Sequence, residues 1–274
     1  MLNGLYANPI IPDSGLGNKL LPWARAAVFC KRTGAKMLAP VWMRLPRLGP
    51  WIFGERDKRL YYRTFANEDC IDGLKRWWIL HRLPHISESE YEEGTCGSVV
   101  VDFKGHEQSF FTPLIGEEQF IRDSIYRMTN DRIHKSLRTE GDDPFVALHV
   151  RRGDFGRAGF KVDDQWYVKA LSLLLTLPES MDRKFVRIFS DAHASELDFL
   201  KRAFPAERFV FDPTRPAIHD ILLMAKAKAL VCTSHSTFSM WARFLGGMPT
   251  IWDAPRGRTP DYIGGDMGSA CYFV

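Results

Sequence analysis

The feature that most constrains the fold of this sequence is a regular alternation of short apolar runs and helical patterns in its second half. The run Phe145–Val150 is almost continuously apolar, as expected for a parallel strand that is covered on both faces. This alternation predicts an α/β domain with a doubly wound parallel sheet. Further strands are predicted at Phe185–Phe189, Phe209–Phe211, Ala229–Thr233 and Thr250–Trp252, and helices at Gln165–Thr176, Ala194–Phe204, Ile218–Lys228 and Thr237–Leu245.

The first half of the chain is less regular but contains elements of the same kinds. A helix is predicted over Asn18–Thr33, with Pro22 in its first turn, where proline is tolerated. The polar, turn-rich segment Thr139–Pro144 marks a junction. We therefore predict two Rossmann-like α/β domains, residues 1–142 and 143–274, that face each other across a cleft. The remaining elements predicted for the first domain are strands near Lys36–Trp42 and at Ser98–Phe103, and helices at Ile71–Leu83 and Glu117–Leu137.

Composition argues against several other classes of protein. The 37 basic and 33 acidic residues leave a net charge of +4, which is too small for a chain that binds nucleic acid. The longest apolar runs are far shorter than the ~20 residues of a membrane span. The first residues show no secretory signal, so we expect a cytoplasmic protein. The cysteines form no C-x-x-C pair, which indicates reduced thiols and no structural zinc site: Cys30, Cys70, Cys96, Cys232 and Cys271.

The segment His149-Val150-Arg151-Arg152-Gly153-Asp154 is the strongest candidate for a functional site. It ends a predicted strand, and ligands of open α/β sheets bind outside the carboxyl ends of strands. Guanidinium groups stay charged and match phosphate oxygens, so the segment suits a phosphorylated ligand. Because Arg151 and Arg152 point in opposite directions on extended backbone, one of them is expected to be structural. The alternative is a surface arginine pair that merely closes a strand.

A second candidate lies where the predicted strand Ala229–Thr233 leads into a helix. Ser234, His235, Ser236 and Thr237 stand at the start of that helix, where unpaired backbone amides and hydroxyl groups form an anion site. Helix capping by Ser234 or Ser236 is the simpler interpretation of this segment taken alone. Together with the arginines at the neighbouring strand end, the segment predicts a cradle for a diphosphate.

Two weaker segments complete the set. Asp191 follows the strand Phe185–Phe189 and could accept hydrogen bonds from a nucleotide base or sugar, or could cap the helix at Ala194. Gly15 and Gly17 form a turn before the first helix that permits close approach of a ligand to the backbone. Leu20 stands where a dinucleotide-binding fingerprint needs its third glycine, which argues against an NAD-dependent oxidoreductase.

The sequence also lacks the motifs of several other enzyme mechanisms. It has no D-x-D triplet, which is the usual acidic clamp of metal-dependent sugar-nucleotide transferases, and no H-E-x-x-H zinc motif. It has no G-x-S-x-G nucleophile elbow. We therefore predict neither a metal site nor a serine nucleophile.

The order of the motifs resembles that of the α-1,2-fucosyltransferases and of the wider fucosyltransferase superfamily with an H-x-R-R-G-D motif. Those motifs are Gly15-x-Gly17-Asn18, His149-x-Arg151-Arg152-Gly153-Asp154, Phe189-Ser190-Asp191, Asp220-x-x-Leu223-Met224 and Ser234-x-Ser236-x-Phe238-Ser239-x-Trp241. The resemblance implies a GT-B architecture of two Rossmann-like domains. It implies metal-independent, inverting transfer of fucose from GDP-fucose, which is bound mainly by the second domain, to a sugar hydroxyl of a glycan.

The same resemblance implies roles for single residues. Arg151 would hold the diphosphate, with Ser236 and Thr237 on the phosphates and with Ser234 and His235 beside them. His149 and Asp191 would lie near the nucleoside, and Gly15, Gly17 and Asn18 would close the cleft from the first domain. Two positions depart from the family pattern, since Lys19 replaces a glutamine and Ala192 replaces a second aspartate. A non-catalytic nucleotide- or glycan-binding protein, or a transferase for another nucleotide sugar, therefore remains as an alternative.

The sequence alone does not select the general base or the acceptor. Asp13 and Asp154 are the candidates for the base that deprotonates the acceptor hydroxyl, although Asp13 could also be a turn residue. The aromatic and basic stretch Arg44–Arg63 could bind a glycan, or could pack into the core through Trp51. It could also contact an anionic membrane surface that carries a lipid-linked oligosaccharide acceptor, which would make the protein peripheral to the membrane.

Overall fold

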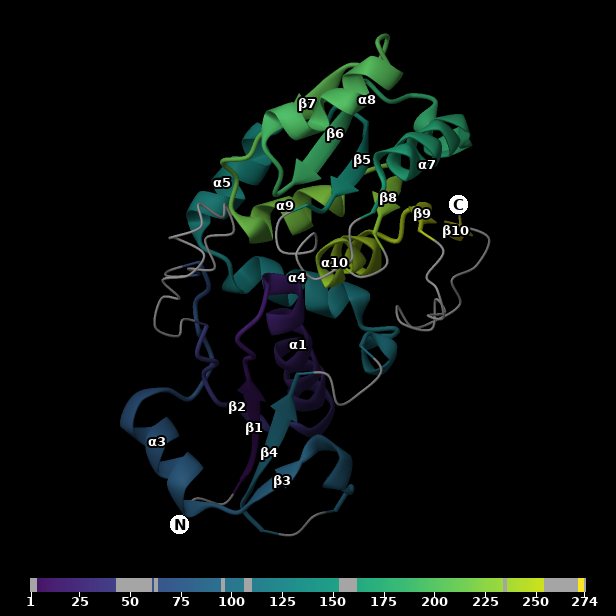
Figure 1. Cartoon of the computed structure of the whole chain (residues 1–274). Helices are drawn as coiled ribbons and strands as arrows, with labels where there is room; N and C mark the ends of the chain where they lie inside the picture. The colour runs from purple at the N-terminus through teal and green to yellow at the C-terminus, as the bar shows by residue number, and fades with distance from the viewer. Residues whose placement is uncertain are drawn as a thin grey trace. The chain divides into compact units, whose positions relative to one another are not determined.

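The computed structural model describes residues 4–42, 61, 64–94, 97–105, 110–152, 162–233, 236–253 and 271–273 (Figure 1). The chain forms two compact units. The first contains residues 1–46 and 59–131, and the second contains residues 47–58 and 132–274. Within the described residues, no helix is long and apolar enough to cross a lipid bilayer.

The first unit is built on a parallel sheet of four strands in the order β2-β1-β4-β3. Tyr6 and Val100 on one face pack beneath α3, and Ala7 and Val101 on the other face pack beneath α1. The strands are β1 (Leu5–Ile10), β2 (Lys36–Met37), β3 (His85–Ser87) and β4 (Val99–Lys104), the helices are α1 (Leu16–Thr33), α3 (Gly73–Arg82) and α4 (Glu118–Met128), and the short 3-10 turns are η1 (Glu88–Glu90) and η2 (Thr112–Leu114).

The second unit has a parallel sheet of six strands in the order β10-β9-β8-β5-β6-β7. The chain runs outward from β5 to β7 and then crosses back to β8 on the other side of β5. This is the 3-2-1-4-5-6 order of a Rossmann sheet, so the doubly wound fold predicted for this half is confirmed. The strands are β5 (Phe145–Val150), β6 (Phe185–Ser190), β7 (Phe209–Phe211), β8 (Leu230–Cys232), β9 (Thr250–Trp252) and β10 (Cys271–Phe273).

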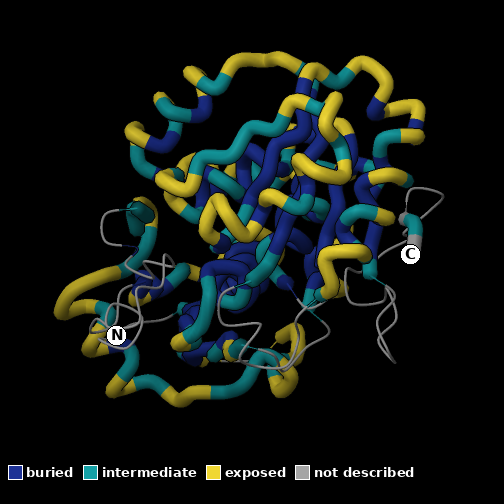
Figure 2. The backbone as a smooth tube through the Cα atoms, turned by 45° about the horizontal axis from the view of Figure 1, so that its top comes forward, coloured by how far each residue is buried: buried dark blue, intermediate teal, exposed yellow. Residues whose placement is uncertain are grey.

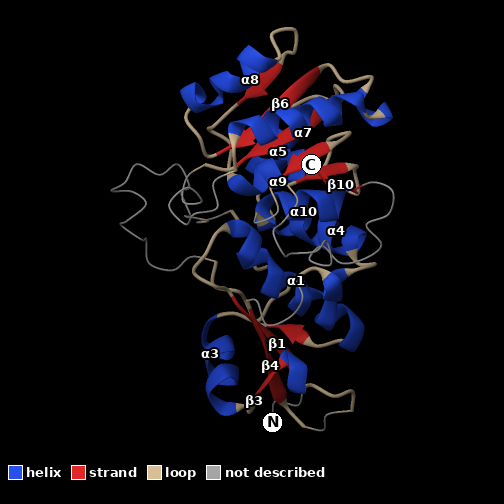
Figure 3. Ribbon diagram, turned by 45° about the vertical axis from the view of Figure 1, so that its right-hand side comes forward, coloured by secondary structure: helices blue, strands red, loops and turns tan. Residues whose placement is uncertain are grey.

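Helices cover both faces of this second sheet (Figure 3). Val146 and Leu148 of β5 form a buried core with Leu171 of α7 and Leu200 of α8 on one face. His149 alternates with them, points to the opposite face and stacks on Phe238 of α10. All six residues of β5 are buried, and Figure 2 shows buried chain enclosed by more exposed segments. The helices are α5 (Asp131–Thr139), α7 (Asp164–Thr176), α8 (Asp198–Ala203), α9 (Ala217–Met224) and α10 (Thr237–Gly246), with 3-10 turns η3 (Pro178–Ser180) and η4 (Ala194–Leu197).

Four local expectations differ from the structure. Strands β1, β3 and β10 were not predicted from the sequence. Pro22 lies inside α1 rather than in its first turn, because the helix begins at Leu16. The single helix predicted over Glu117–Leu137 is two helices, because Thr129 adopts an extended conformation (φ −79°, ψ 149°) that ends α4. The stretch Ala194–Phe204 is likewise divided into η4 and α8.

Candidate functional site

The candidate site lies at the carboxyl ends of β5 and β8. These two strands are neighbours, with Leu148 aligned to Val231, yet the chain leaves them toward opposite edges of the sheet. A crevice outside such a switch point is where ligands of open α/β sheets bind. The structure therefore brings Arg151, which follows β5, and Thr233, which follows β8, to the same edge of the sheet.

His149 is the last-but-one residue of β5 and is almost completely buried. Its ring lies 5.5 Å from that of Phe238, centroid to centroid, and its Nδ1 has no hydrogen-bond partner. Burial, and next the positive charge of Arg151, lower the pKa of His149 to about 3. The imidazole is therefore neutral near pH 7 and presents a buried nitrogen that is free to bond a ligand.

Arg151 follows directly and forms an ion pair with Asp191, with Nη1 of Arg151 2.8 Å from Oδ2 of Asp191. Both side chains are mostly buried, being 19% and 14% exposed. The other carboxylate oxygen of Asp191 accepts a hydrogen bond from the backbone N–H of Arg152 at 2.8 Å. The backbone N–H of Arg151 donates to the Tyr167 hydroxyl at 3.2 Å. Asp191 thus fixes both the guanidinium of Arg151 and the chain beside it.

The residues around Asp191 strengthen the same junction between β5 and β6. The hydroxyl of Ser190 donates to the carbonyl of Val150 at 2.6 Å and accepts from the backbone N–H of Ala192 at 3.0 Å. Ala192 is 1% exposed and belongs to the apolar core. An aspartate at this position would bury a second carboxylate, so the packing accounts for the departure from the family pattern.

Arg152 points away from Arg151, as expected for neighbours on extended backbone. Its guanidinium donates to the carbonyl of Val162 at 3.1 Å and pairs with the carboxylate of Asp164. The same group lies 5.4 Å from the ring centre of Tyr167 and 5.5 Å from that of Phe199. These contacts make the side chain of Arg152 a structural element of the start of α7.

The amino-terminal end of α10 supplies the other side of the site. Ser236 is the N-cap residue, but its hydroxyl makes no capping hydrogen bond. Its backbone N–H donates to the carbonyl of Thr233 at 3.1 Å, and the buried hydroxyl of Thr233 has no hydrogen-bond partner. Capping by the Ser236 side chain is therefore not observed, whereas Ser234, the other capping candidate, lies outside the described residues. The dipole of α10 begins at Thr237 beside the hydroxyls of Thr233 and Ser236.

The glycine turn lies in the first unit, at the carboxyl end of β1. Gly15 is the N-cap residue of α1, with φ −62°, and a Cβ there would meet no atom within 4 Å. Neither backbone conformation nor packing in the described structure requires a glycine at this position. The ammonium of Lys19 is buried and donates to the carbonyl of Pro12 at 2.8 Å. Lys19, the other position that departs from the family pattern, therefore stabilises the turn between β1 and α1. Asp13 is exposed in the same turn, and Gly17 and Asn18 lie in the first turn of α1.

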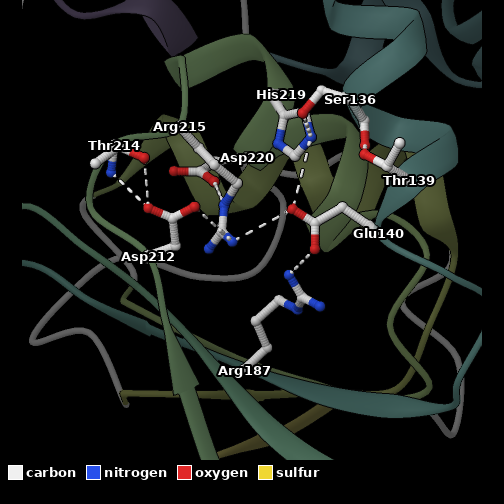
Figure 4. A network of polar contacts seen from close by, with 9 residues as sticks. All are labelled: Ser136, Thr139, Glu140, Arg187, Asp212, Thr214, Arg215, His219 and Asp220. Carbon is white, nitrogen blue, oxygen red and sulfur yellow. Dashed lines mark hydrogen bonds and ion pairs between the residues drawn. The ribbon is translucent and has the colours of Figure 1, made fainter.

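A buried charged network lies on the same sheet and was not predicted from the sequence, although its member Asp220 belongs to one of the motifs (Figure 4). Glu140 pairs with Arg187 of β6 and lies 3.5 Å from Nη1 of Arg215, whose Nε is 2.8 Å from Asp220. Burial raises the pKa of Asp220 to about 7 and lowers that of His219 to about 4. The network ties α5, β6 and the start of α9 together. An arginine inside the apolar strand β6 was the signal that could have revealed it.

Several predicted site residues fall outside the described part of the chain. They are Asp154, Ser234 and His235, together with every residue of Arg44–Arg63 except Tyr61. Within the described ranges, no group of three or more His, Cys, Asp or Glu side chains could hold a metal ion.

Solved fucosyltransferase structures have the same fold. NodZ from Bradyrhizobium matches with a TM-score of 0.59 and 15% identity, over 94% of this chain and 98% of that one. POFUT1 in complex with GDP matches with a TM-score of 0.54 and 13% identity, over 98% and 97% of the two chains. A mutant of Arabidopsis thaliana FUT1 in complex with GDP matches with a TM-score of 0.54 and 15% identity, over 94% of this chain and 72% of that one. The predicted α/β fold of the GT-B type is thereby confirmed.

The family follows from the sequence match. Residues 74–260, about two thirds of the chain, match the model of glycosyl transferase family 11. The matched region contains β5, β8 and α10, and with them the whole candidate site of the second unit. The chain belongs to glycosyl transferase family 11 and is a glycosyltransferase of the fucosyltransferase type. A search of curated protein sequences gave no match.

Proposed function

We propose that this glycosyltransferase transfers fucose from GDP-fucose to a sugar hydroxyl of a glycan or lipid-linked oligosaccharide, with inversion and without a metal ion. The observation that carries the proposal is the position of Arg151 and the start of α10 on the two sides of the β5–β8 switch point. Structures of POFUT1 in complex with GDP-fucose and of NodZ soaked with GDP-fucose share the fold and support this donor.

In the proposed reaction, an acceptor oxygen attacks the anomeric carbon of fucose while the bond from that carbon to the diphosphate breaks. Negative charge grows on the departing GDP, and a fixed cation and oriented N–H and O–H donors stabilise it best when they are in place beforehand. Arg151 supplies the cation, and Asp191 positions its guanidinium by the 2.8 Å ion pair. Ser236 and Thr237, with the N-terminal amides of α10, supply the donors on the other side.

His149 suits a role in binding the nucleoside. Its neutral ring has an unused buried Nδ1, and a buried polar atom of this kind normally has a partner. We propose that the nucleoside provides that partner. In the first unit, we propose that the turn at Gly15, Gly17 and Asn18 takes part in ligand binding, since the space beside Gly15 is open.

The acceptor hydroxyl must lose its proton, and Asp13 and Asp154 remain the two candidates for the base. The proposed linkage is α-1,2, from the order of motifs in the sequence. NodZ is named an α-1,6-fucosyltransferase, so the shared fold does not select the linkage. Analysis of the glycosidic bond in the product would test this part of the proposal separately.

The test of the donor is a panel of thermal unfolding measurements with GDP-fucose, GDP, other sugar nucleotides and NAD, each with and without a chelator. A ligand at 100 times its Kd adds ~2.7 kcal/mol to the free energy of unfolding, which raises Tm by several degrees. We expect shifts with GDP-fucose and GDP that the chelator does not change. A shift only with another sugar nucleotide, or only with a divalent metal present, would contradict the proposal.

A measurement of turnover then distinguishes an enzyme from a protein that only binds GDP-fucose. We expect release of GDP from GDP-fucose to accelerate when a glycan acceptor is added. Binding of GDP-fucose without hydrolysis or transfer on any acceptor would favour the non-catalytic alternative. The two departures that kept this alternative open, Lys19 and Ala192, both have structural roles in the present fold.

A further inference from the structure

Helix α3 of the first unit has an apolar face that points to solvent. Leu74 is 87% exposed, Trp77 56% and Trp78 43%, so three of the exposed large apolar side chains that the structure describes belong to this one helix. Residues three and four apart share one face of a helix, so the three side chains form a single patch. Figure 1 shows α3 at the outside of the sheet of the first unit.

Packing of α3 within the unit does not explain this patch. Ile79 is fully buried against Tyr6, Leu38 and Val100, and Leu80 joins the same cluster, about a third of a turn around the helix from Leu74. The helix is therefore held by its inner face. Two tryptophans left on the outer face are unusual, because water-exposed apolar area of this kind marks a surface that meets something else.

The charges of α3 indicate what that surface meets. The helix carries Lys75, Arg76 and Arg82 and contains no acidic residue. Lys75 and Arg82 are seven residues apart, which is about two turns, so both flank the apolar patch on the same side. The acidic residues Glu68, Asp69 and Asp72 precede the helix, on the side of its positive N-terminal end.

We propose that α3 docks the protein on the surface of an anionic lipid bilayer. Leu74, Trp77 and Trp78 enter the interfacial region, and Lys75 and Arg82 contact the lipid phosphates. Tryptophan prefers the membrane–water interface, and basic residues beside an apolar helix face are typical of helices that lie in that plane. The inference concerns a surface distinct from the donor site and does not depend on the identity of the donor.

The strength of the contact follows from the same residues. Each Lys or Arg near an anionic membrane contributes about fivefold to binding, or ~1 kcal/mol. Lys75 and Arg82 together then favour anionic over neutral vesicles by more than tenfold. A patch of three side chains on one short helix is small, so binding is reversible and falls when salt screens the charges.

The experiment is co-sedimentation of the whole protein, without nucleotide, with vesicles of phosphatidylcholine alone or mixed with phosphatidylglycerol. The test variants are Trp77→Ser with Trp78→Ser, and Lys75→Gln with Arg82→Gln. Matched controls in the second unit are Met181→Ser, which removes a side chain that is 68% exposed, and Lys226→Gln with Lys228→Gln. Circular dichroism and Tm confirm that every variant is folded.

We expect wild type and both controls to bind the anionic vesicles in low salt, and each test variant to bind at least tenfold more weakly. Absence of wild-type binding to anionic vesicles would overturn the proposal, as would test variants that bind like the controls. Light scattering tests whether a second copy of the chain occupies the patch instead of a membrane. A wild-type dimer that becomes monomeric when both tryptophans are replaced, with no vesicle binding, would assign the face to a second copy of the chain. The donor panel on the same variants keeps failure here separate from failure of the proposed function.

Discussion

Replacing Arg151 by alanine is the sharpest test of the proposed chemistry. The substitution removes the cation that is expected to meet the diphosphate, and the loss of one preorganised electrostatic donor costs about 2.7–4 kcal/mol in the transition state, or about 10²–10³ in rate. It also removes the ion pair with Asp191 at 2.8 Å. Breaking a buried ion pair by removal of one partner costs about 3–5 kcal/mol, and the hydrogen bond that Asp191 keeps from the backbone of Arg152 places the expected fall in the free energy of unfolding near the lower end. Most domains of this size remain folded after such a loss.

The assay measures release of GDP from GDP-fucose, and calorimetry measures the affinity for GDP. Arg152→Ala is the matched control, because Arg152 is the next residue and also pairs with a carboxylate, that of Asp164. We expect Arg152→Ala to lower Tm by several degrees, through the loss of its bonds to Val162 and Asp164 and its ring contacts, with a much smaller loss of turnover. Arg151→Lys should fall in between, since an ammonium keeps the charge but not the fork of donors.

Two outcomes would refute this reasoning. The first is near-normal turnover by folded Arg151→Ala, which would remove Arg151 from its proposed role. The second is an equally deep loss of turnover in folded Arg152→Ala, which would transfer the role to the neighbouring arginine.

Two further predictions concern stability. The pKa of His149 is about 3 in the folded chain against 6.5 in the unfolded one, so its contribution to stability is present above pH 6.5 and is lost as the pH falls toward 3. Between pH 7 and pH 4.5, wild type should lose about 2–3 kcal/mol more than His149→Gln in urea unfolding, and equal losses would contradict the burial of the ring. Gly246→Ala should cost about 1–3 kcal/mol, because a Cβ would lie 2.5 Å from the carbonyl oxygen of Ala225, whereas Gly105→Ala, where a Cβ meets nothing within 4 Å, should be nearly neutral by Tm.

The sequence predicted those parts of the fold whose pattern is local and apolar. Strand β5 was predicted with its bounds because its sequence is almost continuously apolar. All six of its residues are buried in the structure. Strand β1 was not, because Asn8 and Pro9 interrupt its apolar character. In the folded unit the amide of Asn8 donates to Asp102 on the neighbouring strand at 2.8 Å, a pairing that depends on sheet register. The break between α4 and α5 was missed because the helical spacing of apolar residues continues through Thr129.

The same distinction holds for the candidate site. The positions of His149 and Ser236 at strand and helix ends follow from general rules for parallel sheets, so the sequence could indicate them. The pairing of Arg151 with Asp191 could not be indicated, because it requires that Val150 and Ser190 be partners in adjacent strands. The network around Glu140 also joins residues from three separate elements, and its members are far apart in the sequence.

The carboxylate beside Arg151 has a consequence for the end of the catalytic cycle. Under the proposed function, the nucleotide that leaves still carries the diphosphate that Arg151 bound, and Asp191 lies within 2.8 Å of that guanidinium. A resident negative charge competes with the phosphates and repels them, which weakens the hold on the spent nucleotide. Product release is therefore expected to be easier from this paired arginine than it would be from a lone one.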